Sequence, residues 1–310
     1  MSDKAIKEIT PEMFEPIGAD ESAGEQITRE RVGFWKDAAR RFRSNWGAMI
    51  GLAIILIISF LAFLGPMMND YDYRTQDYSA LNKEPYADHY FGTDNFGRDL
   101  WQRTWHGAQV SLQIAFLAAL FDLCIGVTIG SVSGYFGGRV DMILQRVVEI
   151  LYSIPSLIII ILMLLIFEPG IIPIALALSL TGWVPMARVV RAQILKLKSQ
   201  EYVLAARTLG AGHRRILLKH LIPNVMGPII IAVTFAIPSA IFFEAFLSFI
   251  GLGIRPPLAS LGSLVNDGSK YLQIFPYQVF YPATILCLIM LAFNLLGDGL
   301  RDALDPRMRK

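Results

Sequence analysis

The acidic residues that could do chemistry in this sequence lie inside long apolar runs. Asp122 and Glu244 each stand in a stretch long enough to cross a membrane. A charged side chain at the centre of a bilayer costs roughly 3 kcal/mol or more. We therefore expect both carboxylates to face the interior of a helix bundle. There they would serve in structural hydrogen bonds or, alternatively, on a path for a polar substrate or a coupling ion.

Catalytic and nucleotide-binding motifs are missing from the sequence. It has no Gly-Lys dipeptide, and therefore no Walker A loop, and it has neither an H-E-x-x-H nor a G-x-S-x-G motif. His213 and His220 lie on a basic stretch without a nearby cysteine, which does not favour a metal site. We expect no catalytic residue, no metal and no bound cofactor, so the energy for any transport must come from another protein.

The composition is that of a membrane protein with helical spans. Hydrophobic residues make up 54% of the chain and charged residues 17%, and the mean hydropathy is +0.47. A span needs about 20 apolar residues, and six stretches meet or nearly meet this requirement. They are residues 47–65, 112–134, 142–167, 170–187, 225–250 and 275–297. The third contains Pro155, where we expect a kink. The sequence thus predicts an all-α polytopic bundle, with a membrane domain over residues 47–310.

Lysine and arginine residues predict the orientation of this bundle. Twenty of them fall on the side of residues 29–46 and six on the opposite side. Basic loops remain in the cytoplasm, so both termini should be cytoplasmic. Residues 1–30 have the composition of a flexible tail, and residues 31–46 predict an amphipathic helix on the membrane surface. A basic stretch that sets the orientation without forming a fixed helix is the alternative for residues 31–46. The net charge of +2 does not favour a nucleic-acid partner.

The connection over residues 188–224 is the longest one on the predicted cytoplasmic side. Good helix formers run from Glu201 to Leu209, and Gly210 follows where a helix end favours a positive φ. We expect a second short helix from about Gly212, broken by Pro223 ahead of the fifth span. A solvated basic linker is the alternative interpretation.

Glycines recur at every fourth position of the second predicted span. Gly126, Gly130 and Gly134 share one helix face. Such a face lets the backbone of another helix approach closely. We expect it to serve in helix packing rather than in chemistry.

The connection over residues 188–224 resembles the EAA loop of the membrane subunits of ATP-binding-cassette (ABC) importers. Ala205, Ala206, Gly210 and Pro223 match the spacing of that motif. Leu204 stands where the family has glutamate, and His220 where it has isoleucine. The resemblance implies a coupling helix that docks on an ATPase subunit. The residues it assigns to coupling are Glu201, Ala205, Ala206, Arg207, Gly210, Arg214 and Pro223.

A second block narrows the resemblance to permeases of oligopeptide or dipeptide importers. It reads HYFGTDNFGRDLWQRTWHGAQVSL over residues 89–112, and GYFGGRVD, EAFLSFIGLGIRPPLASLG and GDGLRDALDP agree with the same family. We expect pairing between Asp and Arg to hold the FGTD-x-x-GRD segment as a turn-rich loop. The resemblance covers residues 34–310.

That resemblance implies a six-span type I importer bundle in the bacterial plasma membrane. It also implies a related second membrane subunit, two ATPase subunits that hold ATP and Mg²⁺, and an extracytoplasmic peptide-binding protein. A nickel or glutathione importer and, from another class, an ion-coupled secondary transporter remain open alternatives.

Overall fold

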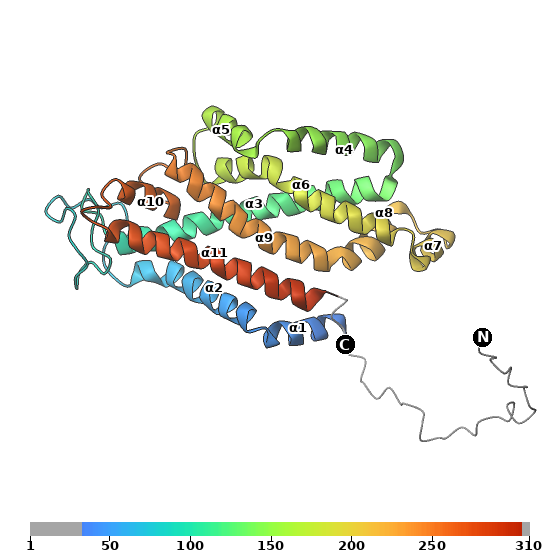
Figure 1. Ribbon diagram of the computed structural model, residues 1–310, viewed down its shortest axis with the longest axis horizontal. Coiled ribbons are helices and arrows are strands. Elements are labelled where there is room, and N and C mark those ends of the chain that lie inside the picture. The colour runs from blue at the N-terminus through green and yellow to red at the C-terminus, as the bar shows by residue number, and fades with distance from the viewer. Residues whose placement is uncertain (1–32, 306–310) are drawn as a thin grey trace, which may run out of the picture.

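The structure is a computed structural model that describes residues 33–305. Over this range the regular elements are helices, and one isolated β-bridge joins Thr93 to Asp99. The helices form one elongated bundle (Figure 1). The predicted tail over residues 1–30 lies outside the described residues, as do the first two residues of the predicted surface helix.

The first two helices divide at a capping residue. α1 covers Phe34–Ser44 and α2 covers Trp46–Leu64, followed by the 3₁₀ turn η2 over Gly65–Met67. The side chain of Asn45 accepts a hydrogen bond from the amide of Ala48 at 3.1 Å and so caps α2. The predicted surface helix therefore ends before Trp46, which belongs to the first apolar helix instead.

Within residues 33–305, five helical segments are long and apolar enough to cross a membrane: Trp46–Met67, Leu100–Phe136, Ile171–Leu197, His213–Phe249 and Tyr277–Leu304. They contain α2, α3 (Leu100–Phe136), α6 (Ile171–Leu197), α9 (Ile222–Phe249) and α11 (Tyr277–Leu304). α3 begins well before the predicted span because Asp99 caps its start, accepting from the amide of Gln102 at 2.7 Å.

The third predicted span, residues 142–167, is two helices rather than one kinked helix. α4 (Gly138–Ser153) and α5 (Ser156–Ile166) meet at an angle of 85°. Proline disfavours helical backbone at the residue before it, and Ile154 is accordingly extended, with φ −94° and ψ 128°. Pro155 thus breaks the helix instead of bending it. Counting this pair as one span gives up to six spans among the described residues.

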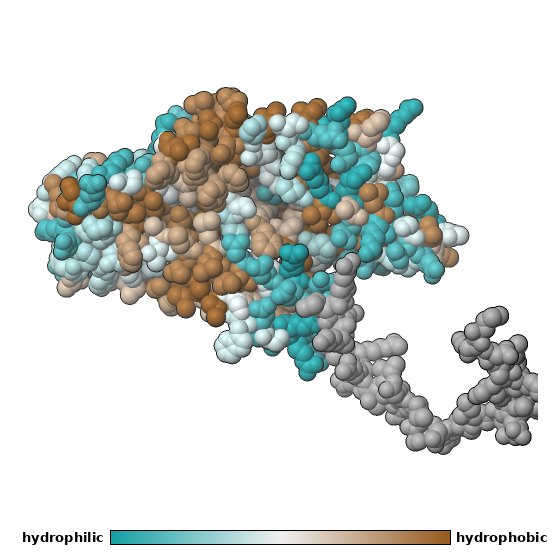
Figure 2. All heavy atoms as spheres, in the orientation of Figure 1, coloured by the Kyte–Doolittle hydropathy of each residue, from teal (hydrophilic) through white to brown (hydrophobic). Residues whose placement is uncertain are grey.

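α3, α6 and α9 form the centre of the bundle. α3 packs most extensively on α6 and next on α9, and α2 packs beside α11. The core between them is made of small and branched side chains, including Ala108, Ile114 and Ile241. Figure 2 shows apolar residues gathered over the middle of the bundle, around α5 and around α2. Phe60 and Ile166 are 62% and 77% exposed there, as expected of side chains that face lipid.

Polar segments lie at the two ends of the bundle. One end carries α10 (Leu261–Ser269) and the long connection between η2 and α3. The opposite end carries α7 (Glu201–Thr208) and α8 (His213–Arg215). α1 and the end of α11 lie toward the same end as α7 and α8 (Figure 1).

Candidate functional site

α7 is a short helix with a fully formed C-terminal cap. The amide of Gly210 donates to the carbonyl of Arg207, and the amide of Ala211 donates to that of Ala206, both at 3.0 Å. These two bonds make a Schellman motif, which needs a left-handed residue after the helix. Gly210 supplies it with φ +80°. The helix therefore ends where the sequence predicts.

One face of α7 packs on the bundle and the other is open. Val203 is fully buried in a cluster with Ile194 and Ile216. Glu201, Ala205 and Arg207 are exposed, and Ala206 is half-buried. Leu209 is 88% exposed and Leu204 47% exposed. The open side thus combines charged side chains with two exposed leucines, Leu204 within the helix and Leu209 directly after it.

The segment after α7 differs from the prediction. The predicted second short helix was expected to stop at Pro223, but α8 continues through a π-helix, Ile216–Leu221, into α9. In this wider turn the amide of Ile222 donates to Leu217, five residues back. Pro223, which has no amide to donate, follows directly after this wider turn as the second residue of α9. The side chain of Asn224 donates to the carbonyl of His220 at 2.6 Å. Arg214 and Pro223 are both exposed.

The end of α3 supports this loop through residues whose contacts with the loop were not predicted from the sequence. Tyr135 Oη lies 2.8 Å from Nδ1 of His213, and the guanidinium of Arg207 lies 6.0 Å from the centre of the Tyr135 ring. Lys198 Nζ donates to the carbonyl of Gly134 at 2.8 Å. Tyr135 and Gly134 fall in the GYFGGRVD motif, and this motif was the one sign in the sequence that the end of α3 has a specific role.

A bidentate ion pair fastens α4 to α6 near the same end. Arg191 donates from Nε and Nη2 to the two carboxylate oxygens of Asp141, each at 2.6 Å. Ser133 donates a further hydrogen bond to Asp141 at 2.5 Å. Bidentate geometry holds two side chains in one orientation. The base of the α7 loop is thus tied to α3, α4 and α6.

The three glycines of α3 lie against α6. A Cβ atom at Gly126 would stand 2.6 Å from Met186 Cβ, and one at Gly130 would stand 2.5 Å from the carbonyl oxygen of Ala187. At Gly134 it would stand 2.9 Å from the carbonyl oxygen of Arg191. These separations are too short for any side chain at the three positions.

Glu244 lies at the meeting point of three helices and is fully buried. Its carboxylate accepts from Ser111 of α3 at 2.9 Å and from Ser248 of α9 at 2.7 Å. Ser248 is in turn 3.1 Å from Ser260, the residue that caps α10. Such a satisfied network joins α3, α9 and α10.

Asp122 is also buried, but in different surroundings. It is 7% exposed, and its Oδ1 atom has no hydrogen-bond partner among the described residues. It lines a cavity together with Thr181 and Gly182 of α6. The structure therefore places the two intramembrane carboxylates in separate sites.

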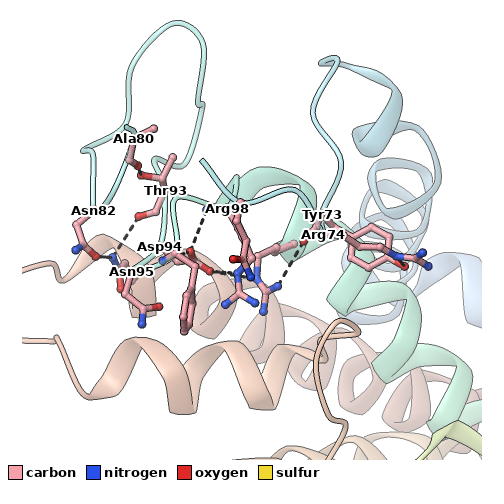
Figure 3. Close-up of polar contacts among 12 residues, drawn as sticks. Tyr73, Arg74, Ala80, Asn82, Thr93, Asp94, Asn95 and Arg98 are labelled. Atoms are coloured by element: carbon pink, nitrogen blue, oxygen red, sulfur yellow. Dashed lines mark hydrogen bonds and ion pairs between the residues drawn. The ribbon is translucent and has the colours of Figure 1, made fainter. Parts of the chain in front are cut away.

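The FGTD-x-x-GRD segment forms a folded loop (Figure 3), at the end of the bundle opposite α7 (Figure 1). Asp94 accepts from Nε of Arg98 at 2.7 Å, and Nε of Arg103 lies 3.5 Å from the same carboxylate oxygen. The side chain of Thr93 accepts from the amide of Lys83 at 2.8 Å. Asp and Arg pairing holds the loop, as the sequence predicts.

Further contacts anchor this loop. The side chain of Asn82 accepts from Gln278 of α11 at 2.9 Å. His89 Nδ1 lies 2.6 Å from a carboxylate oxygen of Asp99, with the Tyr71 ring stacked on His89. The loop is thus a fixed part of the bundle rather than a loose connection.

Comparison with known proteins agrees with this architecture. Residues 126–310 match the family model described as binding-protein-dependent transport system inner membrane component. Residues 33–85 match the N-terminal TM domain of oligopeptide transport permease C.

The curated relatives match nearly the whole chain. The oligopeptide transport system permease protein OppC of Bacillus subtilis is 48% identical over 305 residues, which cover 98% of this chain and 100% of the relative. The dipeptide transport system permease protein DppC of the same organism is 47% identical, over 92% of this chain and 90% of the relative. Escherichia coli OppC is 39% identical, over 93% and 96%.

A solved structure shares the fold. A chain of the inward-facing MetNI methionine ABC transporter aligns with a TM-score of 0.52 at 20% identity, over 64% of this chain and 94% of that chain. The helical architecture and the match over residues 126–310 lead to the same conclusion. The chain belongs to the family of binding-protein-dependent transport system inner membrane components, the membrane subunits of ABC importers.

Proposed function

We propose that this chain is one of two membrane subunits of an ATP-driven importer of short peptides. Its relatives at 48% and 47% identity are named as oligopeptide and dipeptide permeases. The observation that carries the mechanism is α7, a preformed helix with an open side on which Leu204 is exposed, followed directly by the exposed Leu209. One ATPase subunit would dock on α7 of this chain, and a second would dock on a related second membrane subunit. An extracytoplasmic protein would deliver the peptide.

The proposed mechanism makes the α7 loop the input for movement. ATP-driven closure of the ATPase pair would displace α7, and the ties through Tyr135 and His213 would pass that displacement to α3. The path for the peptide would run between the two membrane subunits. ATP and Mg²⁺ would be bound by the ATPase subunits, and this chain itself would catalyse no reaction.

The proposed orientation places α7 in the cytoplasm of a bacterial cell with this chain in the plasma membrane. Eight lysine and arginine residues lie between positions 188 and 227, and four lie in the long connection at 67–108. This asymmetry favours a cytoplasmic α7 end, with both termini on the same side.

Reconstitution tests the proposal. The complete transporter, with both membrane subunits, the ATPase subunits and the peptide-binding protein, should take up radiolabelled trialanine into vesicles when ATP is supplied on the α7 side. Nickel and glutathione uptake are measured in parallel. ATP-dependent uptake of either of these without uptake of trialanine would contradict the peptide assignment, and uptake driven by an ion gradient without ATP would contradict the importer class.

A further inference from the structure

A cavity of about 520 Å³ lies among α3, α6, α9 and the break between α4 and α5. Its walls are mainly apolar and aromatic, and Asp122 is the one charged residue among the described residues that line it. Cavities that hold small molecules have volumes of about 300–1,000 Å³ and combine apolar walls with a few polar groups. The cavity therefore has the size and lining of a ligand site.

The carboxylate of Asp122 lacks the partners that Glu244 has. None of the ion pairs among the described residues involves Asp122, and its buried Oδ1 accepts no hydrogen bond from them. A buried charged group without a partner is unstable in a low-dielectric site. A cation that enters the cavity would supply the missing partner.

The neighbouring helix α6 leaves space for this carboxylate. A Cβ atom at Gly182 of α6 would stand 2.6 Å from Oδ2 and 2.7 Å from Oδ1 of Asp122. Any side chain at position 182 would therefore displace the acidic group. Glycine at this position allows the carboxylate to sit at the wall of the cavity between α3 and α6.

The chemistry of the lining selects the kind of cation. A divalent metal ion requires several oxygen ligands, and no group of three His, Cys, Asp or Glu side chains that could hold a metal occurs in the described part of the chain. One carboxylate among apolar and aromatic walls suits an organic cation with a compact apolar body. A short peptide with a protonated amino terminus has this chemistry.

We propose that Asp122 binds the protonated amino terminus of a peptide that occupies this cavity, within one membrane subunit, before the peptide continues along the path between the two subunits. The inference rests on the proposed function, because it takes the cargo to be a peptide. It adds a site within the membrane domain that distinguishes peptides with a free amino group from peptides whose amino group is blocked.

A thiol reporter in the cavity tests the charge. In the complete transporter, with Cys124→Ala and Cys287→Ala, the reporter is Ser239→Cys, at an exposed position on the cavity wall. It is treated with the cation 2-aminoethyl methanethiosulfonate and, separately, with the anion 2-sulfonatoethyl methanethiosulfonate. Asp122→Asn should lower the ratio of cation to anion modification rates about tenfold. Glu149→Gln removes an equal charge outside the cavity and should leave the ratio unchanged.

Protection by peptides tests the ligand. Trialanine should slow modification of the reporter, whereas N-acetyl-trialanine at the same concentration should not. Asp122→Asn should abolish this protection. Gly182→Ala keeps the charge but crowds the carboxylate, so it should weaken the protection. This variant replaces Asp122→Asn as the test if the asparagine variant fails to fold.

The outcomes of these experiments distinguish failure of the proposed Asp122 site from failure of the proposed transport function. Suppose that the same vesicles take up trialanine, but that the two peptides protect the reporter equally or that neither protects it. This result would overturn the inference and leave the proposed function intact. An unchanged ratio in Asp122→Asn would also overturn it. Loss of the second membrane subunit on copurification of Asp122→Asn would show that the carboxylate pairs with that subunit instead. Failure of the unaltered transporter to take up any peptide would overturn the proposed function and the inference together.

Discussion

At the scale of single residues, the end of α7 depends on a backbone conformation. Gly210 has φ +80°, and apart from Gly210 and its two chain neighbours no atom of the described residues lies within 4 Å of the position that its Cβ would occupy. Space is therefore available for a side chain, but the left-handed backbone disfavours one by roughly 1–2 kcal/mol. The requirement for glycine at this position is conformational rather than steric.

Gly210→Val should impair peptide uptake while leaving the subunit folded in the membrane. The valine would strain the Schellman motif and displace the segment that carries Arg214. Uptake and substrate-stimulated ATP hydrolysis, measured in vesicles, should fall together. Gly212→Ala is the matched control, because Gly212 has φ −68° and also has open space around it. Normal uptake by Gly210→Val would argue for a solvated linker.

A buried carboxylate should dominate the stability of the loop in Figure 3. Asp94 faces both Arg98 and Arg103, and all three side chains are at most 9% exposed. Asp94→Ala leaves two buried guanidinium groups without their partner, and removal of one member of a buried pair costs about 3–5 kcal/mol. Thermal unfolding of the purified transporter should show a lower midpoint.

The control for Asp94→Ala is an exposed ion pair of similar length. Glu149 lies 3.2 Å from Arg146, with side chains 60% and 76% exposed. Exposed pairs contribute about 0–1 kcal/mol, so Glu149→Ala should leave the unfolding midpoint nearly unchanged. Equal effects of the two variants would show that the Asp94 cluster does not stabilise the loop.

At the scale of helices, close packing of α3 on α6 is the main contact of the bundle. Gly130→Leu should prevent assembly, because its Cβ alone would lie 2.5 Å from the Ala187 carbonyl oxygen. Cys124→Leu adds bulk to an exposed face of the same helix and should be tolerated. The measurement is the yield of subunit that copurifies with its partners. Normal yield of Gly130→Leu would place the glycine face outside the packed interior.

Helix positions followed from sequence more readily than helix ends did. Runs of apolar residues placed the long helices, and the pattern from Glu201 to Gly210 placed α7 and its cap. The 85° angle after Ser153 could not be predicted, because a proline sets the local break but packing sets the angle. The π-helical entry to α9 depends on widened hydrogen bonds that leave no periodic signal.

At the scale of the whole molecule, the sequence indicated which polar residues face the interior but not which residues they contact. It predicted that Asp122 and Glu244 face the interior, but it could not assign Ser111 and Ser248 to one of them and a cavity to the other. Such assignments depend on the rotation of each helix about its axis. The same limit hid the contact between Tyr135 and His213, which lie 78 residues apart.

Orientation is also a property of the whole molecule, and labelling can measure it. In a background with Cys124→Ala and Cys287→Ala, a membrane-impermeant maleimide should label Glu84→Cys from outside intact cells. Thr208→Cys should react only after the cells are opened, because α7 is expected on the basic, cytoplasmic side. Both positions are exposed. Glu84 lies in the connection between η2 and α3 and Thr208 ends α7, and these two elements lie at opposite ends of the bundle. Labelling of Thr208→Cys alone from outside would reverse the topology.

The continuous helix from His213 to Phe249 has a mechanical consequence. Its 37 residues make a rod about 55 Å long at 1.5 Å per residue. One end carries the contact with Tyr135, and the carboxylate of Glu244 holds the other end to α10 through Ser248 and Ser260. Pro228 and Pro238 each remove a backbone hydrogen bond inside this helix, but the helix still resists compression along its axis, so a push at one end would produce tilt at the other. Tilting of this one helix, rather than a series of local rearrangements, would then transmit movement from one membrane surface to the other.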